Sequence, residues 1–460
     1  MSETAELPTE DSPQGEVDVS KAVALSAMIE ENDAAAISRL MAGLHPADIA
    51  DLIEQLTAEQ QEELAKLAPD ILTGEVLANL QWDTRELVAA HLDPAHLAAA
   101  IQELDSDDAT LLVEELDDAL RAQVMAEVPE EDRAALESSL SFDEETAGRL
   151  MQREFVAAPD FWTVGHTIDH MRAAGDELPE LFFDVYVVNT GFEPVGAVSV
   201  SRLMRSKRAV MLSEIMDEIR VRIDPDTDQE DVAYYFEKYH LISAPVVDAA
   251  GRLSGMLTVD DMVEVIQEEN KEDILALAGV NEAGLTDTVM ESVKSRAPWL
   301  LVNLGTAVLA SGVIALFEGA ISQLVALAVL MPIVASMGGN AGTQSLTVAV
   351  RAISSRDLTS ANARRVIWRE GMTGAFNGLI FAVVMGLVAG FWFQNWALAG
   401  VIAAAMIINL ACAGLAGILV PLGLKRFGAD PAVASSVFVT TVTDVVGFFA
   451  FLGLAAMVLL

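Results

Sequence analysis

Residues 431–448 read PAVASSVFVTTVTDVVGF, and the apolar segment 432–460 around them carries a single charge, Asp444. A carboxylate at the centre of a bilayer costs about 2.5–3.5 kcal/mol to insert, so such a residue marks a functional site by default. Thr440 lies one helical turn before Asp444 and Gly447 just under one turn after it, which predicts a narrow polar stripe on one helix face. The alternative is an aspartate hydrogen-bonded to a Thr or Asn of another helix. Because the apolar segments contain no Lys or Arg to neutralise Asp444, we favour an ion-binding position.

Five segments are long enough to span a membrane, which takes roughly 20 mostly apolar residues. They are Ala297–Phe317, Ile321 to about Val350, Met372–Phe393, Trp396–Leu422 and Ala432–Leu460. Short polar or charged stretches separate them. The second half of the chain is therefore predicted to be a bundle of five membrane helices.

The basic residues predict the orientation of this bundle, because loops rich in Lys and Arg stay in the cytoplasm. Basic residues occur before the first segment, between the second and third, and between the fourth and fifth, at 294–296, 351–369 and 425–426. The opposite loops, near Glu318 and Gln394, carry neither Lys nor Arg. We therefore predict a multi-pass protein of the cell (inner) membrane with a cytoplasmic N-terminal half and an external C-terminus.

The second apolar segment contains Pro332 and then GGNAGTQS at residues 338–345. Proline and paired glycines interrupt helix hydrogen bonding, which a bilayer tolerates only where the backbone is buried or lines water. We expect a broken helix here, whose freed carbonyls, with Asn340 and Gln344, offer oxygen ligands or partners for the water shell of an ion. The alternative is close helix packing through small residues.

The soluble half is strongly acidic. The chain has 27 basic and 69 acidic residues and a net charge of −42; residues 1–296 account for −44, because the remainder carries +2. Such a charge repels nucleic acids and anionic lipid heads and attracts cations, so we expect no nucleic-acid partner. The alternative is that the acidity only aids solubility or adapts the protein to high salt, which is the more frequent reason for an acidic composition.

Several other classes are disfavoured by what the sequence lacks. Residues 1–19 are polar and acidic without an apolar core, which predicts a disordered tail and not a signal peptide. The single cysteine, Cys412, lies in an apolar run and excludes a disulfide framework or a thiolate metal cluster. Nucleophile elbows and phosphate-cradling loops are missing, so we predict that the protein is not an enzyme.

Two repeats organise the soluble half. Residues 20–140 contain short amphipathic helices with apolar residues at three- and four-residue spacing and acidic or Pro boundaries, as in HPADIADLIEQL (45–56) and DPAHLAAAIQEL (93–104). Further on, VVNTGFEPVGAVSVSRLM (187–204) matches VVDAAGRLSGMLTVDDMV (246–263) at an offset of 59 residues. Each copy predicts strand, turn, strand and helix.

This second repeat, with Met151 and Met216 near the entry to each copy, resembles a tandem pair of CBS domains. Such pairs are regulatory modules and sometimes bind adenine nucleotides. Thr258 and Asp261 have the Thr-x-x-Asp spacing that often holds a ribose, whereas the first copy has Ser199 and Arg202 there. ATP is therefore a candidate ligand.

An acidic helical stretch follows the second copy. Its carboxylates are spaced to share helix faces, with Lys271 as the local base. They are Asp261, Glu264, Glu268, Glu269, Glu272 and Asp273. Like charges so close together repel unless a cation intervenes, so the stretch is either a solvated acidic face or a divalent metal site. A second helix, through about Lys294, leads into the membrane.

His166 and His170 have the i, i+4 spacing that can hold Zn²⁺. A third ligand and a His-Glu-x-x-His pattern are missing from the sequence. A solvated helix face is the better interpretation.

Taken together, the chain resembles the bacterial MgtE-type magnesium channels and transporters over about residues 20–460. The resemblance rests on GGNAGTQS with the following RAISSRDL, and on DPAVASSVFVTTVTDVVGF near the end. It implies a multi-domain, mainly α fold with a helical superstructure, a tandem α/β CBS pair, a connecting helix and a five-helix transmembrane domain. The expected bounds are a disordered tail (1–19), the helical N domain (20–145), CBS domain 1 (146–207), CBS domain 2 (208–268), the connecting helix (269–295) and the channel domain (296–460).

The resemblance further implies a homodimer whose pore lies on the two-fold axis, between spans two and five. Asp444 of each subunit would face the ion, with the carbonyls of Thr440 and Gly339 and the side chain of Asn340 close by. Mg²⁺ gives up its water reluctantly and prefers octahedral oxygen ligands, so two carboxylates can hold its hydrated form.

The resemblance also implies regulatory Mg²⁺ sites in the soluble half, whose ions bridge domains, hold the connecting helix closed beneath the pore and leave when cytoplasmic Mg²⁺ falls. Their residues are Glu75, Asp107, Asp228, Glu230, Asp261, Glu264, Glu269, Glu272, Asp273 and Asp430. Two positions depart from the family pattern: His240 stands in place of an aspartate, and Leu111 in place of an acidic residue.

The sequence thus predicts a Mg²⁺-selective channel that cytoplasmic Mg²⁺ closes. Two other functions stay open. One is a carrier that couples a divalent cation to Na⁺ or H⁺, for which Asp444 would serve equally well. The other is a membrane-anchored divalent-ion or nucleotide sensor that transports nothing, against which Asp444 and the expected broken span count.

Overall fold

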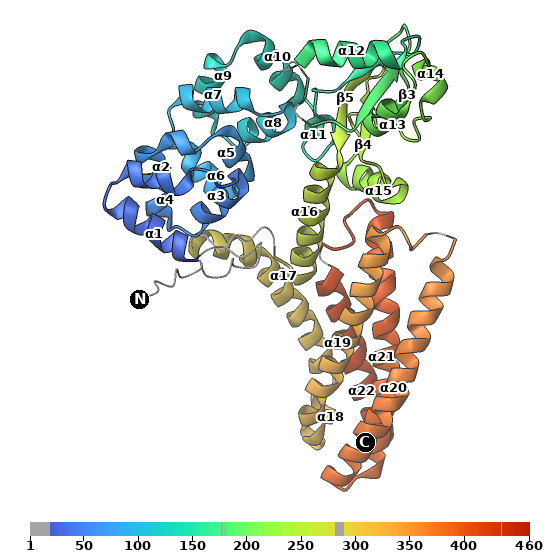
Figure 1. Ribbon diagram of the computed structural model, residues 1–460. Coiled ribbons are helices and arrows are strands. Elements are labelled where there is room, and N and C mark those ends of the chain that lie inside the picture. Colours follow the sequence, from blue (N-terminus) through green and yellow to red (C-terminus); the bar gives the residue numbers. More distant parts are fainter. Residues whose placement is uncertain (1–18, 176–177, 180, 281–288, 360, 434) are drawn as a thin grey trace, which may run out of the picture. The chain divides into compact units, whose positions relative to one another are not determined.

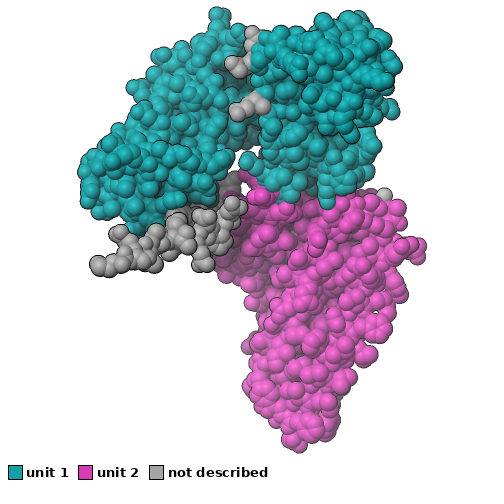
Figure 2. Space-filling model, in the orientation of Figure 1, with its two compact units in different colours: residues 1–266 teal, residues 267–460 magenta. Residues whose placement is uncertain are grey.

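A computed structural model (Figure 1) describes residues 19–175, 178–179, 181–280, 289–359, 361–433 and 435–460, without the side chains of Glu291 and Ser435. The chain divides into two compact units, residues 1–266 and 267–460, coloured teal and magenta in Figure 2. Apart from Val19, the predicted disordered tail lies outside the described residues. The predicted mainly helical, multi-domain fold is confirmed.

The first part of unit 1 is built from short helices (Figure 1). Polar side chains begin several of them: the Thr57 hydroxyl accepts from Gln60 N–H while the Gln60 side chain accepts from Thr57 N–H, which forms a capping box. The helices are α1 (Val19–Glu30), α2 (Ala34–Met41), α3 (Pro46–Glu54), α4 (Ala58–Leu67), the 3₁₀ turn η1 (Pro69–Ile71), α5 (Gly74–Asn79), α6 (Trp82–Ala89), α7 (Pro94–Glu103), α8 (Ser106–Glu114), α9 (Asp118–Glu127) and α10 (Glu130–Ser139).

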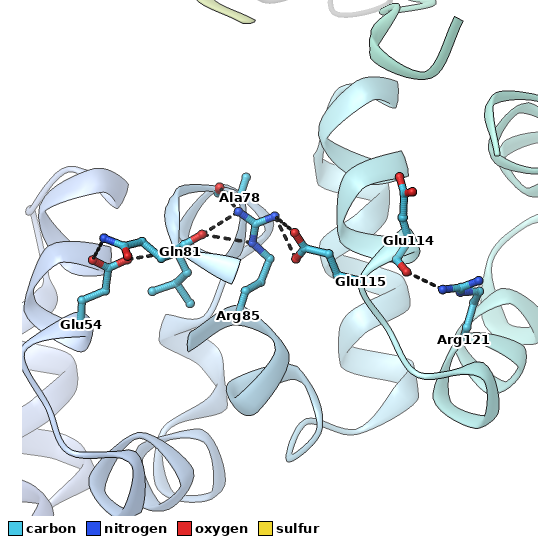
Figure 3. Close-up of polar contacts among 8 residues, drawn as sticks. Glu54, Ala78, Gln81, Arg85, Glu114, Glu115 and Arg121 are labelled. Carbon is cyan, nitrogen blue, oxygen red and sulfur yellow. Dashed lines mark hydrogen bonds and ion pairs between the residues drawn. The ribbon is translucent and has the colours of Figure 1, made fainter. Parts of the chain in front are cut away.

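Three arginines join successive helices of this region in the same way. Arg85, Arg121 and Arg133 each donate hydrogen bonds to the carbonyls five and seven residues earlier in the chain. These carbonyls belong to the end of the preceding helix, where the last turn leaves acceptors without intrahelical partners. Figure 3 shows two of these arginines, and Arg85 there also contacts the Glu115 carboxylate at 3.1 Å.

The two hairpins of the CBS pair coincide when the numbering is shifted by 59 residues. Strands β2 (Asp184–Val188) and β3 (Pro194–Ser199) correspond residue for residue to β4 (Ser243–Val247) and β5 (Leu253–Thr258). Both hairpins are antiparallel, and both carry an irregularity at the same position. The sequence repeat is therefore a repeat of structure.

Other elements complete the pair, and β1 extends the first hairpin as a parallel strand beside β2. They are α11 (Ala147–Leu150), β1 (Ala157–Pro159), α12 (Val164–Ala174), α13 (Val200–Arg205), α14 (Leu212–Ile215), α15 (Gln229–Tyr239) and α16 (Val259–Ala278).

The repeated glycines each admit a methionine from the entry to the other copy. A Cβ on Gly196 would lie 2.6 Å from the sulfur of Met216, and one on Gly255 would lie 2.9 Å from that of Met151. The two copies therefore interlock through their first segments. This packing explains why both positions are glycine.

Helix α16 carries the acidic stretch and ends at Ala278; the next residue, Gly279, has a φ of +69°. Val280 N–H donates to the Leu275 carbonyl at 3.0 Å, as at a helix end capped by a glycine in the left-handed region. Of the rest of the predicted connecting helix, residues 281–288 lie outside the described residues. The next helix begins at Val289.

Among the described residues, five helices are long and apolar enough to cross a membrane, as predicted. Helix α21 is the most enclosed of them and lies among α19, α20 and α22. Unit 2 contains α17 (Val289–Ala315), α18 (Glu318–Gln323), α19 (Ala326–Ser354), α20 (Ala363–Phe393), α21 (Trp396–Arg426) and α22 (Ser435–Val458).

The predicted break in the second span is wrong, because α19 is one continuous helix through Pro332 and the whole of GGNAGTQS. Its glycines are needed for packing. A Cβ on Gly342 would lie 2.6 Å from Val439 of α22, and one on Gly417 of α21 would lie 2.6 Å from the Cβ of Ser345. Close contact through small residues, the alternative interpretation, accounts for this motif.

Candidate ion sites

Asp444 lies in the middle of α22, half-buried. In the part of the chain that the structure describes, its carboxylate forms neither an ion pair nor a hydrogen bond. The neighbouring hydroxyls bond within the helix: Thr440 donates to the Ser436 carbonyl at 2.9 Å, and Thr443 to the Thr440 carbonyl at 2.9 Å. The Asp444 charge is thus left to be satisfied from outside α22.

The GGNAGTQS segment of α19 packs against this part of α22. Gly339 faces Thr440, whose methyl group would lie 3.9 Å from a Cβ at that position. Gly342 likewise admits Val439 and Thr443. Asn340 is exposed on the surface of unit 2. The structure therefore brings together Gly339 and Thr440, two of the predicted pore residues.

Threonine hydroxyls already engage both carbonyls predicted to face the ion. Thr343 donates to the Gly339 carbonyl at 3.0 Å, and Thr443 to that of Thr440. A carbonyl oxygen has two lone pairs, of which the helix uses one. An ion's water could therefore bond these oxygens only when the hydroxyls rotate away.

Behind α19 lies a carboxylate that sequence reasoning missed. Glu370 of α20 is buried, accepts a hydrogen bond from Ser345 at 3.1 Å and pairs with Arg369 at 3.1 Å. In the sequence Glu370 lies just before the apolar segment Met372–Phe393 and follows Arg369, so it looked like part of the basic loop, whereas α20 already begins at Ala363.

At the end of the bundle where α19 ends and α22 begins, the last turns of α16 contact the membrane helices of unit 2. The Asp273 carboxylate accepts from Ser354 at the end of α19 at 2.9 Å. Burial raises the pKa of Asp273; the Ser354 bond opposes this shift, and the negative charge of Asp430 adds to it. Leu277, one turn on, packs in the cluster around Ala432. Two predicted regulatory carboxylates, Asp273 and Asp430, thus lie near each other.

A second pair of predicted carboxylates meets within unit 1. Burial, and then the charge of Asp261, raises the pKa of Asp107 well above its ordinary value. Burial raises the pKa of Asp261 to about 7, although Thr258 donates to its carboxylate. Both residues line a cavity of about 100 Å³ whose other acidic residues are Asp105, Asp108, Asp184 and Asp260. The described residues that line this cavity include six aspartates and neither Lys, Arg nor His.

Glu264 belongs to the same region, because its charge raises the pKa of Asp108 after the larger effect of burial. The structure does not place the other predicted ligands in this cluster. Asp228 caps α15 by accepting from Glu230 N–H at 2.9 Å, and Glu75 is exposed in the first turn of α5. Glu269 is half-buried and Glu272 is exposed on α16.

No group of three or more His, Cys, Asp or Glu residues that could hold a metal ion occurs among the described residues. The candidate sites instead bring carboxylates together in pairs. Mg²⁺ commonly keeps several of its waters and binds only one or two carboxylates. A pair of carboxylates therefore suits Mg²⁺ better than it would suit an ion that needs a full set of protein ligands.

A larger cavity of about 250 Å³ lies at the CBS pair, lined among others by Ser199, Asp217 and His240. Thr258 and Asp261 face the acidic cavity instead. His240 ends α15 in the left-handed conformation, with a φ of +51°. Leu111, the other departure from the family pattern, is exposed on α8.

The two histidines with possible Zn²⁺ spacing pack against one aromatic ring. His166 and His170 contact Trp162 edge-on, with ring centroids 4.3 and 5.0 Å apart. Their i, i+4 spacing is therefore explained by packing against Trp162.

Three protein-family models match the chain. The divalent cation transporter model of MgtE matches residues 331–454, the MgtE intracellular N domain matches residues 44–145, and the CBS domain matches residues 212–268. The first match includes most of α19 and α22, with the contact between Gly339 and Thr440.

Similar proteins include two curated relatives and one solved structure. The magnesium transporter MgtE of Thermus thermophilus is 31% identical over 457 residues, covering 95% of this chain and 98% of the relative. That of Enterococcus faecalis is 33% identical over 327 residues, covering 71% and 72%. The crystal structure of the cytosolic domain of the Mg²⁺ channel MgtE in complex with ATP is 30% identical, with a TM-score of 0.49, covering 53% of this chain and 99% of that one.

Proposed function

The chain belongs to the MgtE family of magnesium transporters, membrane proteins and not a class of enzymes, and we propose that it is a Mg²⁺ channel closed by cytoplasmic Mg²⁺. The pore would lie between the α19 and α22 helices of a homodimer. Residues 1–296 would be cytoplasmic and Leu460 external, as the basic loops of the membrane half favour. ATP is the candidate ligand of the larger CBS cavity.

The Asp444 carboxylate is the observation that carries this proposal. It lies half-buried in an apolar helix, beside the contact of Gly339 with Thr440, and the described residues offer it no partner. In a dimer, two such carboxylates would repel each other unless a cation lay between them. A hydrated Mg²⁺ fits this demand, because its waters can donate charge-assisted hydrogen bonds to both.

Closing would use the paired carboxylates of the soluble half and of the cytoplasmic end of the bundle. Mg²⁺ between Asp107 and Asp261 would hold α8 against α16, and Mg²⁺ near Asp273 and Asp430 would hold the end of α16 against the membrane helices. Without the ion these charges repel. Mg²⁺ would thus bind the closed state better and shift the population toward it. We propose Glu75, Asp228, Glu230, Glu264, Glu269 and Glu272 as further ligands.

A carrier coupled to H⁺ or Na⁺ is the second candidate, because Asp444 could exchange a proton as readily as it holds an ion. A sensor that transports nothing is disfavoured by membership of a transporter family. Single-channel recording of the purified chain in lipid bilayers decides between them: unitary Mg²⁺ currents identify a channel, coupled flux without unitary currents a carrier, and neither a sensor.

The Asp444→Asn variant tests the pore itself. The amide keeps the shape of the side chain but removes its charge, so the protein should still assemble while Mg²⁺ affinity and discrimination against Na⁺ fall. Glu318→Gln, an exposed acid between α17 and α19, is the matched control and should behave as wild type. Wild-type selectivity in Asp444→Asn would place the ion site elsewhere.

A further inference from the structure

Asn409 of α21 is fully buried in the membrane half of the protein. Its amide Nδ2 donates to the Val334 carbonyl of α19 at 2.8 Å, while its Oδ1 has no partner among the described residues. A polar side chain with one unsatisfied atom is costly in apolar surroundings. Burial alone would favour an apolar residue here, so its amide must serve some other purpose.

The surroundings of Asn409 are two glycines on the two helices assigned to the pore. A Cβ on Gly338 of α19 would fall well inside contact distance of Asn409 Nδ2, and one on Gly447 of α22 would lie 2.7 Å from it. Any larger residue at either position would push its helix away from α21. The amide thus fills the space between α19 and α22 from behind.

The hydrogen bond to α19 depends on Gly338. A helical side chain leans toward the N-terminus and covers the turn before it, so a residue at 338 would cover the carbonyl four residues earlier. That carbonyl is Val334, the acceptor of Asn409. The glycine therefore uncovers the oxygen, and the amide takes its free lone pair.

We infer that Asn409 is a positioning residue: it fixes the distance between α19 and α22 and thereby influences ion selectivity. The inference rests on the proposed pore. Gly338 directly precedes Gly339 and Asn340, and Gly447 follows Asp444 by three residues. Because a helix is stiff over one turn, a displacement at either glycine moves the ion-facing groups by a similar distance. Hydrogen bonds to the water shell of an ion weaken steeply beyond about 3.2 Å, so such a shift would change selectivity before it abolished folding.

Mg²⁺ flux into proteoliposomes tests this role. Flux can be measured for a channel and for a carrier alike, so the test does not depend on the outcome of the single-channel recording. The measurements are the Mg²⁺ concentration at half-maximal flux, the maximal flux per protein, and the ratio of Mg²⁺ to Na⁺ permeability. In Asn409→Ala we expect the ratio to fall about tenfold, the effect of one interhelical hydrogen bond and its spacer. A residue that merely stabilises the fold would lower the maximal flux and leave the ratio and the half-maximal concentration unchanged.

The double variant Gly338→Ala/Asn409→Ala provides the rescue. The methyl group added at position 338 occupies the space that the amide leaves, so the ratio of Mg²⁺ to Na⁺ permeability should return to within about threefold of wild type. Gly338→Ala alone should lower this ratio. Matched controls are Asn377→Ala, a half-buried asparagine of α20, and Gly400→Ala on α21, where a Cβ meets nothing within 4 Å. An unchanged ratio in Asn409→Ala, or a double variant no better than the worse single variant, would overturn the inference. If Asn409→Ala does not fold, a lowered ratio in the filled double variant overturns it as well.

Discussion

Protons and Mg²⁺ should compete for the Asp107–Asp261 pair, so the proposed closing by Mg²⁺ would depend on pH. Burial raises the pKa of Asp261 to about 7, and burial and Asp261 together raise that of Asp107. Near neutral pH this pair therefore holds a proton when no metal is bound. A divalent ion must displace that proton to bind.

The size of the effect follows from the shift of Asp261. A rise from 3.8 to about 7 corresponds to about 4 kcal/mol of preference for the protonated form, at 1.36 kcal/mol per pKa unit. The sign follows from linkage: in the absence of Mg²⁺ this stabilisation of the folded state is full below pH 3.8 and is lost as the pH rises through about 7. Mg²⁺ affinity should show the opposite trend, rising about tenfold per pH unit from about pH 5 to 7 and levelling off above that.

Calorimetric titration of the full chain in detergent with Mg²⁺, at pH 5.5, 6.5, 7.5 and 8.5, measures this directly. Repeating it in buffers of different ionisation enthalpy counts the protons released. Asp261→Asn should bind more weakly and lose most of the pH dependence. Asp169→Asn is the control, because Arg208 holds the pKa of this exposed carboxyl below its usual value. A Mg²⁺ affinity that does not change between pH 5.5 and 7.5, or a pH dependence that survives in Asp261→Asn, would refute the reasoning.

Three further variants and one labelling experiment test other parts of the structure. Arg85→Met leaves Glu115 buried without its cation, and hydrogen exchange should show α5–α8 less stable by about 3–5 kcal/mol. Ser354→Ala removes the hydrogen bond to Asp273, so amide protection at the end of α16 should fall about tenfold. Gly417→Ala should lower the yield of folded protein by forcing α19 and α21 apart, whereas Gly423→Ala, with open space around its Cβ, should not; equal yields would contradict the packing. Cysteines introduced at 351–369 in a Cys412→Ala background should resist labelling from outside intact cells, and labelling there would contradict the proposed topology.

Much of the fold could be predicted because its signals are local. Apolar length identifies the membrane helices, and the offset of 59 residues identifies the paired hairpins without knowledge of their neighbours. The matching of β2 with β4 and of β3 with β5 is as close in the structure as in the sequence. Asp444 could also be predicted as a site residue, because a single charge in an apolar span is evident from the sequence alone.

The remainder depends on contacts between segments far apart in the chain. Pro332 and the paired glycines suggested a broken helix, because a local rule considers only the backbone of one segment. The structure shows that Gly338 makes room for Asn409 of α21 and Gly342 for Val439 of α22. Asn409 is an ordinary polar residue in sequence, and it becomes informative only when the glycines on both sides are known. The same holds for Asp107 and Asp261, which lie over 150 residues apart and acquire raised pKa values only when α16 approaches α8.

The acidic residues of the chain differ in what faces them. Some face a guanidinium, as Glu115 faces Arg85 and Glu114 faces Arg149, each at 3.1 Å. A covalently attached cation neutralises such a carboxylate permanently, so its contact cannot respond to the ions in solution.

Others face a further carboxylate, as Asp107 faces Asp261 and as Asp273 lies near Asp430, and none of these four has an ion pair among the described residues. Solubility does not explain Asp107, Asp261 and Asp273, because charges that serve solubility lie in water, whereas burial raises the pKa of each of these three carboxyls. Paired and partly buried carboxylates hold their helices together only while a mobile cation or a proton lies between them. The strength of those contacts is then set by the concentration of that cation, through ordinary mass action. Repulsion between these carboxylates would therefore let the protein respond to Mg²⁺. The proposed sensing contacts lie on α16, the helix whose far end packs against the membrane helices through Leu277.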